Sequence, residues 1–454
     1  MYIIEPNNKI PLHIQLYNEL KKDIIENLNI GDKLPSIRKT SSLYNLSKNT
    51  VQTAYNQLYA EGYIESYPKS AYVVSDTNYE DFTPKKEIAI LKNSASVEYK
   101  YDFAPARLSK DTFPLKLWKR VFNKAIDESL DFGAYPNGKG EVGLREEIAK
   151  YLVSSRGVKC HLNQIIICHG FGDSMTLLAK ILQSKYNHFA IENPGYHIAN
   201  QIFEDYGYKI DQIAVDENGI NLTQLTQSNA KIVYVTPSHQ YPTGVSIPIS
   251  NRLKLLEWAN LKDGIIIEDD YDSELSYLNR PIPCLQGLDN NDKVVYLGTF
   301  SKSFSPALRI SYMVLPIHLL EKFEKYYDSY FSKVSLFTQK TLELFMKEGY
   351  WDRHLRKIRT LNRKKHNIMR DCLKKYLGET MEIIVQGGGL SIIIIPIVQF
   401  DFAKLEKLAV KEKIKIYFTK DDWKTLRMGF GGFKEDEIEN AVIAFSKIWN
   451  KSLI

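Results

Sequence analysis

Residues 294–315 read VVYLGTFSKSFSPALRISYMVL, and they place a lysine between two apolar runs. The runs 294–298 and 310–315 are rich in β-branched and aromatic residues, as is typical of buried strands. Lys302 lies among hydroxyl-bearing residues after the first run, and Arg309 follows it. A lysine at a strand exit can form a Schiff base with an aldehyde cofactor, and hydroxyl groups with an arginine suit a dianionic phosphate. Most lysines are only solvated, so this interpretation depends on the rest of the chain.

Short apolar runs of the same kind recur upstream and alternate with longer helical patterns. Runs that are apolar at every position are typical of strands covered on both faces, as in a mostly parallel α/β sheet. The other predicted strands are IIIC (165–168), FAIE (189–192), IVYV (232–235) and GIIIED (264–269). Residues 330–454 combine long helical patterns with one more apolar run, which predicts a smaller α/β subdomain. The predicted fold class of this part is therefore α/β.

The predicted strand at 264–269 runs into a cluster of carboxylates. Asp269 and Tyr271 are two positions apart, so they project to the same side if the strand continues. A carboxylate beside a pyridine nitrogen keeps that nitrogen protonated and makes the ring an electron sink, and a phenol can contact the ring hydroxyl. Metal binding and a simple acidic strand end are alternative interpretations. Counting along the strand does not decide which of Asp269, Asp270 and Asp272 points inward.

Three other strand ends carry groups that suit an anionic or aromatic ligand. Gly170-Phe171-Gly172 opens a helix, whose N-terminal amides can bind a phosphate. Tyr196 follows the strand at 189–192, where its ring can stack on a cofactor, and residues 236–244 form another polar turn. A lone Gly-x-Gly is usually just a tight turn. Ligands of open α/β sheets nevertheless bind at such strand ends.

The first seventy-five residues follow a different pattern. Residues 11–28 show helical spacing, and two more helices are predicted after Ser36 and Ser47, whose hydroxyls can cap free amides. Two short strands then flank a turn at 68–70. Three helices closed by a hairpin form the outline of a winged helix-turn-helix. The predicted domains are a DNA-binding domain at 1–75, a linker at 76–100 and a large α/β domain at 101–454.

Polar side chains gather at the N-terminal ends of the second and third predicted helices. There, free amides and short side chains can meet phosphates and base edges in the major groove. A capping box on a solvated face would explain the same residues, but the complete three-helix pattern favours DNA binding. The candidate DNA contacts are Ser36, Arg38, Ser47, Lys48, Asn49, Thr50 and, at the wing tip, Lys69.

The composition of the 454-residue chain is that of an ordinary globular protein. It is 44% hydrophobic and 25% charged, which excludes collagen-like, disordered and disulfide-stapled classes. Its 60 basic and 54 acidic residues leave a charge of +6, which permits nucleic-acid binding without demanding it. The four cysteines form no CxxC pair, so no metal site is predicted. The chain shows no signal-peptide pattern, and its longest apolar run is about half of a membrane span. We therefore expect a cytoplasmic protein without membrane contact.

Two parts of the chain resemble known families. Residues 34–64 resemble the GntR family of winged helix-turn-helix regulators. Matching positions are Leu34-Pro35-Ser36, Arg38, Thr50-Val51, Ala54-Tyr55, Leu58 and Gly62. The strand ends of the large part together resemble fold-type I aminotransferases. A GntR-type module ahead of such a domain resembles the layout of MocR/GabR-type transcriptional regulators, as do the phrases HQYPTG (239–244), EDDYDSE (268–274) and TFSKSFSPALR (299–309).

This resemblance implies pyridoxal 5'-phosphate as the cofactor and gives roles to individual residues. Lys302 forms the Schiff base in this scheme, Asp269 pairs with the pyridine nitrogen, and Tyr271 with the ring hydroxyl. Tyr196 stacks on the ring. The implied phosphate-binding positions are Gly170, Phe171, Thr299, Ser301 and Arg309.

The resemblance also implies a homodimer and an effector site. Tyr135 matches a tyrosine that reaches the phosphate of the neighbouring subunit, and Arg427 matches the arginine that binds the α-carboxylate of an amino acid. Tyr241 stands where aminotransferases usually carry asparagine, which argues against efficient transamination. No arginine follows Tyr196 in HIAN (197–200), so a ligand with one carboxylate, or the cofactor alone, fits better than a diacid.

The implied function is a transcriptional regulator that binds double-stranded promoter DNA and senses pyridoxal phosphate or a small amino compound. The alternative is a working aminotransferase with an accessory N-terminal domain. Both functions need Lys302, whereas only the regulator needs a complete winged helix. We therefore expect a sensor rather than an enzyme, although the cofactor's own chemistry would allow a half-transamination.

Overall fold

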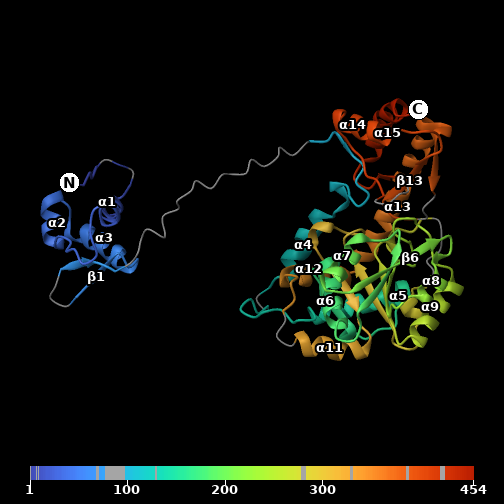
Figure 1. Ribbon diagram of the computed structural model, residues 1–454, viewed down its shortest axis with the longest axis horizontal. Helices are drawn as coiled ribbons and strands as arrows, with labels where there is room; N and C mark the ends of the chain where they lie inside the picture. Colours follow the sequence, from blue (N-terminus) through green and yellow to red (C-terminus); the bar gives the residue numbers. More distant parts are fainter. Residues whose placement is uncertain are drawn as a thin grey trace. The chain divides into compact units, whose positions relative to one another are not determined.

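The computed structural model describes residues 2–6, 8, 10–67, 71–76, 98–127, 130–277, 283–327, 331–384, 388–419 and 425–454. The chain divides into two compact units, Met1–Ser96 and Val97–Ile454 (Figure 1). The candidate DNA contact Lys69 and residues 77–97 of the predicted linker lie outside the described residues. Each unit has its own hydrophobic core.

The N-terminal unit is the predicted three-helix domain with a hairpin. Its helices are α1 (Leu12–Glu26), α2 (Ile37–Tyr44) and α3 (Lys48–Ala60), and its strands are β1 (Ile64–Ser66) and β2 (Tyr72–Val74). The strands are antiparallel, with Ile64 opposite Val74. The helices pack around buried Leu16, Tyr55 and Leu58. The amphipathic spacing of the sequence is therefore sufficient to explain this core.

Hydroxyl caps determine where α2 and α3 begin. The Ser36 hydroxyl accepts a hydrogen bond from the Lys39 amide at 3.3 Å, and the Ser47 hydroxyl accepts one from the Thr50 amide at 3.1 Å. Each cap satisfies an amide that has no partner within its helix. Asn45 between the helices adopts a left-handed conformation with φ of 51°, which turns the chain from one helix into the next.

In the described part of the second unit, eight strands form the main sheet in the order β4-β11-β10-β9-β8-β5-β6-β7. They are β4 (Ile165–Cys168), β5 (His188–Asn193), β6 (Lys209–Asp216), β7 (Gly219–Ile220), β8 (Ile232–Val235), β9 (Ile265–Asp270), β10 (Val294–Thr299) and β11 (Ser311–Val314). The neighbours from β10 through β9, β8 and β5 to β6 are parallel, and β11 and β7 pair antiparallel. The predicted α/β class is confirmed.

The sequence patterns missed β6 and β7 at one edge of the sheet. Strand β6 has only Ile213 fully buried, and its other side chains are exposed or half-buried. An edge strand of this kind has no continuous apolar run, so a search for such runs does not find it.

Helices cover both faces of this sheet, and the buried side chains of the second unit form three hydrophobic clusters. Along β4, Ile165 and Ile167 join one hydrophobic cluster, whereas Ile166 and Cys168 join another. Alternate side chains of a strand point to opposite faces, which explains this division. The helices of this part are α4 (Leu115–Ala125), α5 (Val142–Arg156), α6 (Phe171–Leu182), α7 (His197–Asp205), α8 (Leu222–Gln227), α9 (Ile249–Leu261), α10 (Leu285–Leu288), α11 (Ile317–Tyr327) and α12 (Leu336–Lys347).

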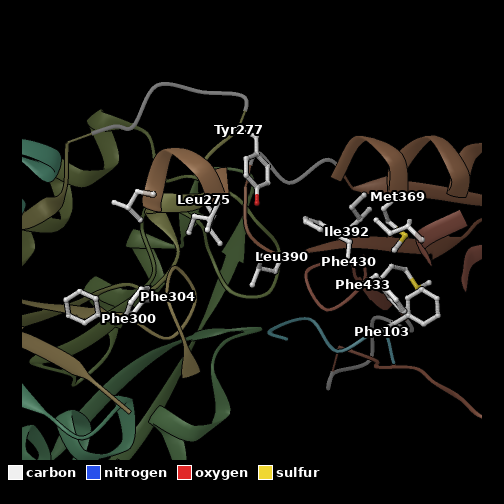
Figure 2. Packing of buried hydrophobic residues seen from close by; sticks show 14 of the residues in the cluster. Phe103, Leu275, Tyr277, Phe300, Phe304, Met369, Leu390, Ile392, Phe430 and Phe433 are labelled. Atoms are coloured by element: carbon white, nitrogen blue, oxygen red, sulfur yellow. The ribbon is translucent and has the colours of Figure 1, made fainter. Parts of the chain in front are cut away.

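The C-terminal part forms the predicted smaller subdomain. Its elements are α13 (Tyr350–Leu377), β12 (Met381–Ile384), β13 (Ser391–Pro396), α14 (Phe402–Lys411), β14 (Ile414–Lys415), β15 (Leu426–Gly429) and α15 (Glu435–Lys451). Strands β12, β13 and β15 form an antiparallel sheet, and β14 pairs with β3 (Tyr101–Asp102). Figure 2 shows Met369, Ile392 and Phe430 packed beside Phe103 in this subdomain. Among the described residues, no helix is long and apolar enough to cross a membrane.

Candidate functional site

A cavity of about 610 Å³ opens where the parallel strands of the main sheet end. Strands β8, β9 and β10 each contribute residues to its wall. The predicted site residues that line it are Phe171, Tyr196, Asp269, Tyr271, Thr299, Ser301, Lys302, Arg309 and Arg427. The structure thus brings together side chains that are far apart in the sequence, at the edge of the sheet where α/β proteins bind ligands.

Among the carboxylates at the end of β9, Asp269 is the one that lines this cavity. Asp269 is an even number of positions from Ile265 and Ile267, so it lies on the same side of β9 as these two residues, which face the core beneath α6. The Tyr234 hydroxyl donates a hydrogen bond of 2.6 Å to Asp269 Oδ2. Burial raises the pKa of Asp269 to about 7. A cationic ring nitrogen beside it would favour the ionised form again.

The other two candidate carboxylates have protein partners. Asp270 points to the opposite face of the sheet, where Oδ2 lies 2.6 Å from the Nε of Arg156. Asp272 Oδ2 lies 2.7 Å from the Nδ1 of His239. The question that counting along the strand left open is therefore answered by geometry, because only Asp269 lines the large cavity.

Lys302 lines the same cavity, with its Nζ 5.7 Å from the centre of the Tyr271 ring. Burial and the nearby Arg427 guanidinium lower the pKa of Lys302 to about 8. An amine attacks a carbonyl carbon only in its neutral form, and a lowered pKa increases the neutral fraction near pH 7. The environment of Lys302 therefore suits covalent attachment of an aldehyde.

Helix α6 and Arg309 together form a candidate phosphate cradle. Gly170 caps α6 with φ of 78°, and a Cβ at this position would overlap the Arg309 guanidinium. The absence of a side chain at Gly170 lets the guanidinium approach the positive end of the helix. The Thr299 and Ser301 hydroxyls line the same cavity and lie 3.0 Å apart. Amides, hydroxyls and a guanidinium at one place are the donors that a phosphate needs.

We expect Gly170→Ala to weaken binding of a phosphate-bearing cofactor by about tenfold to a hundredfold, because the new Cβ displaces Arg309 and the backbone is strained. Gly207→Ala is the matched control, since Gly207 has nearly the same φ of 79° and no atom near its Cβ position. The measurement is a titration of each apoprotein with the cofactor, followed by absorbance. Equal affinity in the two variants would remove Gly170 and Arg309 from the phosphate site.

Aromatic rings and an arginine form the remaining wall of the cavity. The Tyr196 ring lies edge-on to Phe171 and Tyr241, with centre distances of 5.0 and 5.2 Å. The Arg427 guanidinium carbon lies 4.6 Å from the centre of the Tyr241 ring. The Nε of Arg427 is buried, and no described residue accepts a hydrogen bond from it. A carboxylate would satisfy this donor.

In the N-terminal unit, most of the predicted DNA contacts are accessible. Ser36, Arg38, Lys48 and Asn49 are exposed at the N-terminal ends of α2 and α3, as is Ser47. Thr50 is half-buried, and its hydroxyl lies 2.8 Å from the Ser47 hydroxyl. Ser36 and Ser47 thus act as helix caps, and the neighbouring side chains stay free to meet DNA.

Comparison with known proteins assigns both units. Residues 105–441 match the aminotransferase class I and II family, and residues 12–74 match the bacterial regulatory proteins of the gntR family. The uncharacterized HTH-type transcriptional regulator YdeL of Bacillus subtilis (strain 168) is 36% identical over 452 residues, or 97% of each chain. The probable rhizopine catabolism regulatory protein MocR of Rhizobium meliloti is 30% identical, over 87% of this chain and 83% of its own. The chain belongs to the MocR-type family of transcriptional regulators.

The structural comparison agrees with this family. The crystal structure of a multiple substrate aminotransferase from Thermococcus profundus aligns with a TM-score of 0.70 and 25% identity, over 83% of this chain and 99% of that chain. The resemblance to MocR-type regulators and the predicted fold are thus confirmed. A regulatory function is favoured over the aminotransferase alternative, because the relatives that share both units are named as regulators.

One group of the regulator's cavity was missed by sequence reasoning. The Tyr271 hydroxyl donates a hydrogen bond of 2.9 Å to the backbone carbonyl of His239. The His239 ring lies between Asp272 and a small recess that Lys302 and Arg427 also line. The sequence signals for His239 were its place in the polar turn 236–244 and in the phrase HQYPTG (239–244), and neither gives it a chemical role.

Tyr135 is the predicted site residue that the structure leaves away from the cavity. Its side chain is 77% exposed and stacks on Phe331, with ring centres 4.4 Å apart. A residue that completes the site of a neighbouring subunit would be exposed in a single chain. The role of Tyr135 stays a prediction.

Proposed function

We propose that this regulator binds pyridoxal 5'-phosphate at the large cavity and uses it to sense the cofactor itself or a small amino compound. The N-terminal unit binds double-stranded promoter DNA, and ligand binding changes how it engages that DNA. The observation that carries this proposal is the meeting of Lys302, Asp269 and the Gly170–Arg309 cradle at one cavity. Coupling between the two units requires only that the ligand bind their alternative arrangements with different affinities.

The residues at the cavity fit this cofactor. Lys302 would hold its aldehyde carbon, and Asp269 its ring nitrogen. In this proposal, the phosphate would be bound by Gly170, Phe171, Thr299, Ser301 and Arg309. The ring would be contacted by Tyr196 and Tyr271. When bound, the cofactor supplies an electrophilic carbon that reacts with amines and a ring that accepts electrons. The protein's own part is to hold a neutral amine at Lys302 and an anion at Asp269.

Arg427 supports an effector with a single carboxylate. Its unpartnered Nε and its place beside Lys302 suit an amino acid whose amine faces the cofactor. Among the described residues that line the large cavity, Arg309 is the only arginine besides Arg427, and it belongs to the phosphate cradle. A monocarboxylate therefore satisfies the described wall better than a diacid.

We also propose a homodimer in which Tyr135 reaches the neighbouring cofactor site. Tyr135→Ala is expected to weaken cofactor binding about threefold to tenfold, because one hydrogen bond to a charged phosphate is lost. Tyr326→Ala removes another exposed tyrosine and should leave the affinity unchanged. Sedimentation velocity gives the oligomeric state at the same time. A wild-type protein that sediments as a monomer and still binds the cofactor tightly would contradict the proposed dimer.

The DNA-binding proposal is tested with Arg38→Ala. The loss of a charge-assisted contact with a base is expected to cost about 1–3 kcal/mol of sequence-specific affinity. Lys22→Ala, which removes an equal charge from α1, is the control. Mobility-shift titrations on the protein's own promoter region at stated salt give both affinities. Equal affinities of the two variants would mean that Arg38 is only a solvent-exposed helix residue and does not contact a base.

The same titration separates a regulator from a working aminotransferase. A regulator shifts its promoter DNA with sequence preference, and the cofactor or an amino compound changes that affinity. An aminotransferase with an accessory domain shows turnover and no specific shift. Position 241 holds a tyrosine where aminotransferases usually carry asparagine, which agrees with a regulator rather than an aminotransferase.

A further inference from the structure

A second cavity of about 230 Å³ adjoins the large one. Pro105, His197, Tyr241 and Arg427 line both cavities, so a ligand held at Arg427 has access to each. The end of β5, helix α7 and residues 417–419 form its other walls. This side cavity has no role in the function proposed so far.

Two buried oxygen atoms of the side cavity's lining residues lack a partner. Glu192 is 2% exposed, and its Oε2 accepts hydrogen bonds from the Thr236 amide at 3.2 Å, the Thr236 hydroxyl at 2.7 Å and Gln240 Nε2 at 3.3 Å. Its Oε1 is buried and accepts no hydrogen bond from any described residue, and the same holds for Oδ1 of Asn200. Buried polar atoms are normally paired, so two unpaired acceptors at one cavity indicate an occupant that donates hydrogen bonds.

The charges of the side cavity point to the same kind of occupant. Glu192 is one of the residues that line the side cavity, and Arg427 lines both this cavity and the large one. Burial raises the pKa of Glu192 to about 7, and a cation at its side would restore the ionised carboxylate. A molecule with a carboxylate at Arg427 and a positive group near Glu192 would compensate both charges.

We propose that the side cavity binds the distal end of the effector, and that the effector is an amino acid with one carboxylate and a terminal ammonium group. This inference rests on the proposed function, in which the carboxylate binds Arg427 and the α-amine faces Lys302. Glu192 and Asn200 accept hydrogen bonds from the distal group. An apolar side chain leaves both oxygens unpaired and is rejected for that reason.

The test compares lysine with norleucine, which lacks the terminal ammonium group, on the cofactor-loaded full-length protein. Calorimetry and the change in cofactor absorbance both report binding. Lysine is expected to bind at least about tenfold more tightly, since hydrogen bonds to charged groups are lost with norleucine. Asn200→Leu and Glu192→Gln are each expected to reduce this preference. Gln201→Leu, at the exposed neighbouring position of α7, should preserve it.

The outcomes separate this inference from the function on which it rests. Equal affinity for lysine and norleucine, binding of neither, or an undiminished preference in both cavity variants would overturn the inference alone. The variants' cofactor absorbance shows that they are folded, and Asn200→Leu leaves the contacts of Glu192 with Thr236 in place. A protein that never binds the cofactor would contradict the proposed function and this inference together.

Discussion

The purified wild-type protein is expected to turn yellow with pyridoxal phosphate, and Lys302→Ala is expected to abolish this colour. Lys302 is the lysine that lines the large cavity, and burial with the neighbouring Arg427 lowers its pKa to about 8. Without its amine, the cofactor aldehyde has no nucleophile with which to form a covalent bond at this site. The measurement is the absorbance spectrum after incubation with the cofactor and removal of the excess. We expect complete loss of the band rather than a partial decrease.

A second buried lysine provides the control for this experiment. Lys365 on α13 is also buried with a lowered pKa, and its Nζ donates a hydrogen bond to the Gly431 carbonyl at 3.3 Å. Lys365→Met removes a buried amine outside the cavity, so it should retain the band. In wild-type apoprotein the band should form faster above a pH of about 8 than below it, because the Lys302 amine is then neutral. A colourless wild type, or a yellow Lys302→Ala, would refute covalent attachment at this residue.

The central strands were predictable because a strand that is buried on both faces is apolar at nearly every position, and such runs are visible in the sequence. The run GIIIED gave β9, and the spacing of two between Asp269 and Tyr271 placed both on one side of the chain, where both line the cavity. Alternation alone cannot say which side faces the ligand. That depends on α5 and α6, which cover opposite faces of the sheet and are far from β9 in the sequence.

The features that escaped sequence analysis are those that depend on partners distant in the chain. His239 contacts Tyr271 through its backbone carbonyl, and no side-chain pattern reports such a bond. Arg156 lies at the end of α5 in an unremarkable helical pattern, and it pairs with Asp270 of β9. The wing tip at Lys69 lies outside the described residues, so its predicted DNA contact stays a prediction.

The Arg156–Asp270 pair is expected to be essential for the stability of the second unit. Arg156 Nε lies 2.6 Å from Asp270 Oδ2, and both side chains are almost fully buried. The Tyr296 hydroxyl also donates to Asp270, at 2.6 Å. Arg156→Met would leave a carboxylate in the core without its cation. Breaking a buried ion pair from one side costs about 3–5 kcal/mol of unfolding free energy.

Urea unfolding followed by tryptophan fluorescence measures this loss against two references. Lys185→Met breaks the solvent-exposed pair with Asp263 and should cost about 1 kcal/mol or less. Arg156→Met combined with Asp270→Leu removes both charges and should recover much of the stability, since the penalty comes from the unpaired carboxylate. The folded single variant should still bind the cofactor, because Asp269 points to the opposite face of β9 from Asp270. Equal losses in the buried and exposed variants would mean that water reaches Asp270, and the pair would then contribute no more than a surface ion pair.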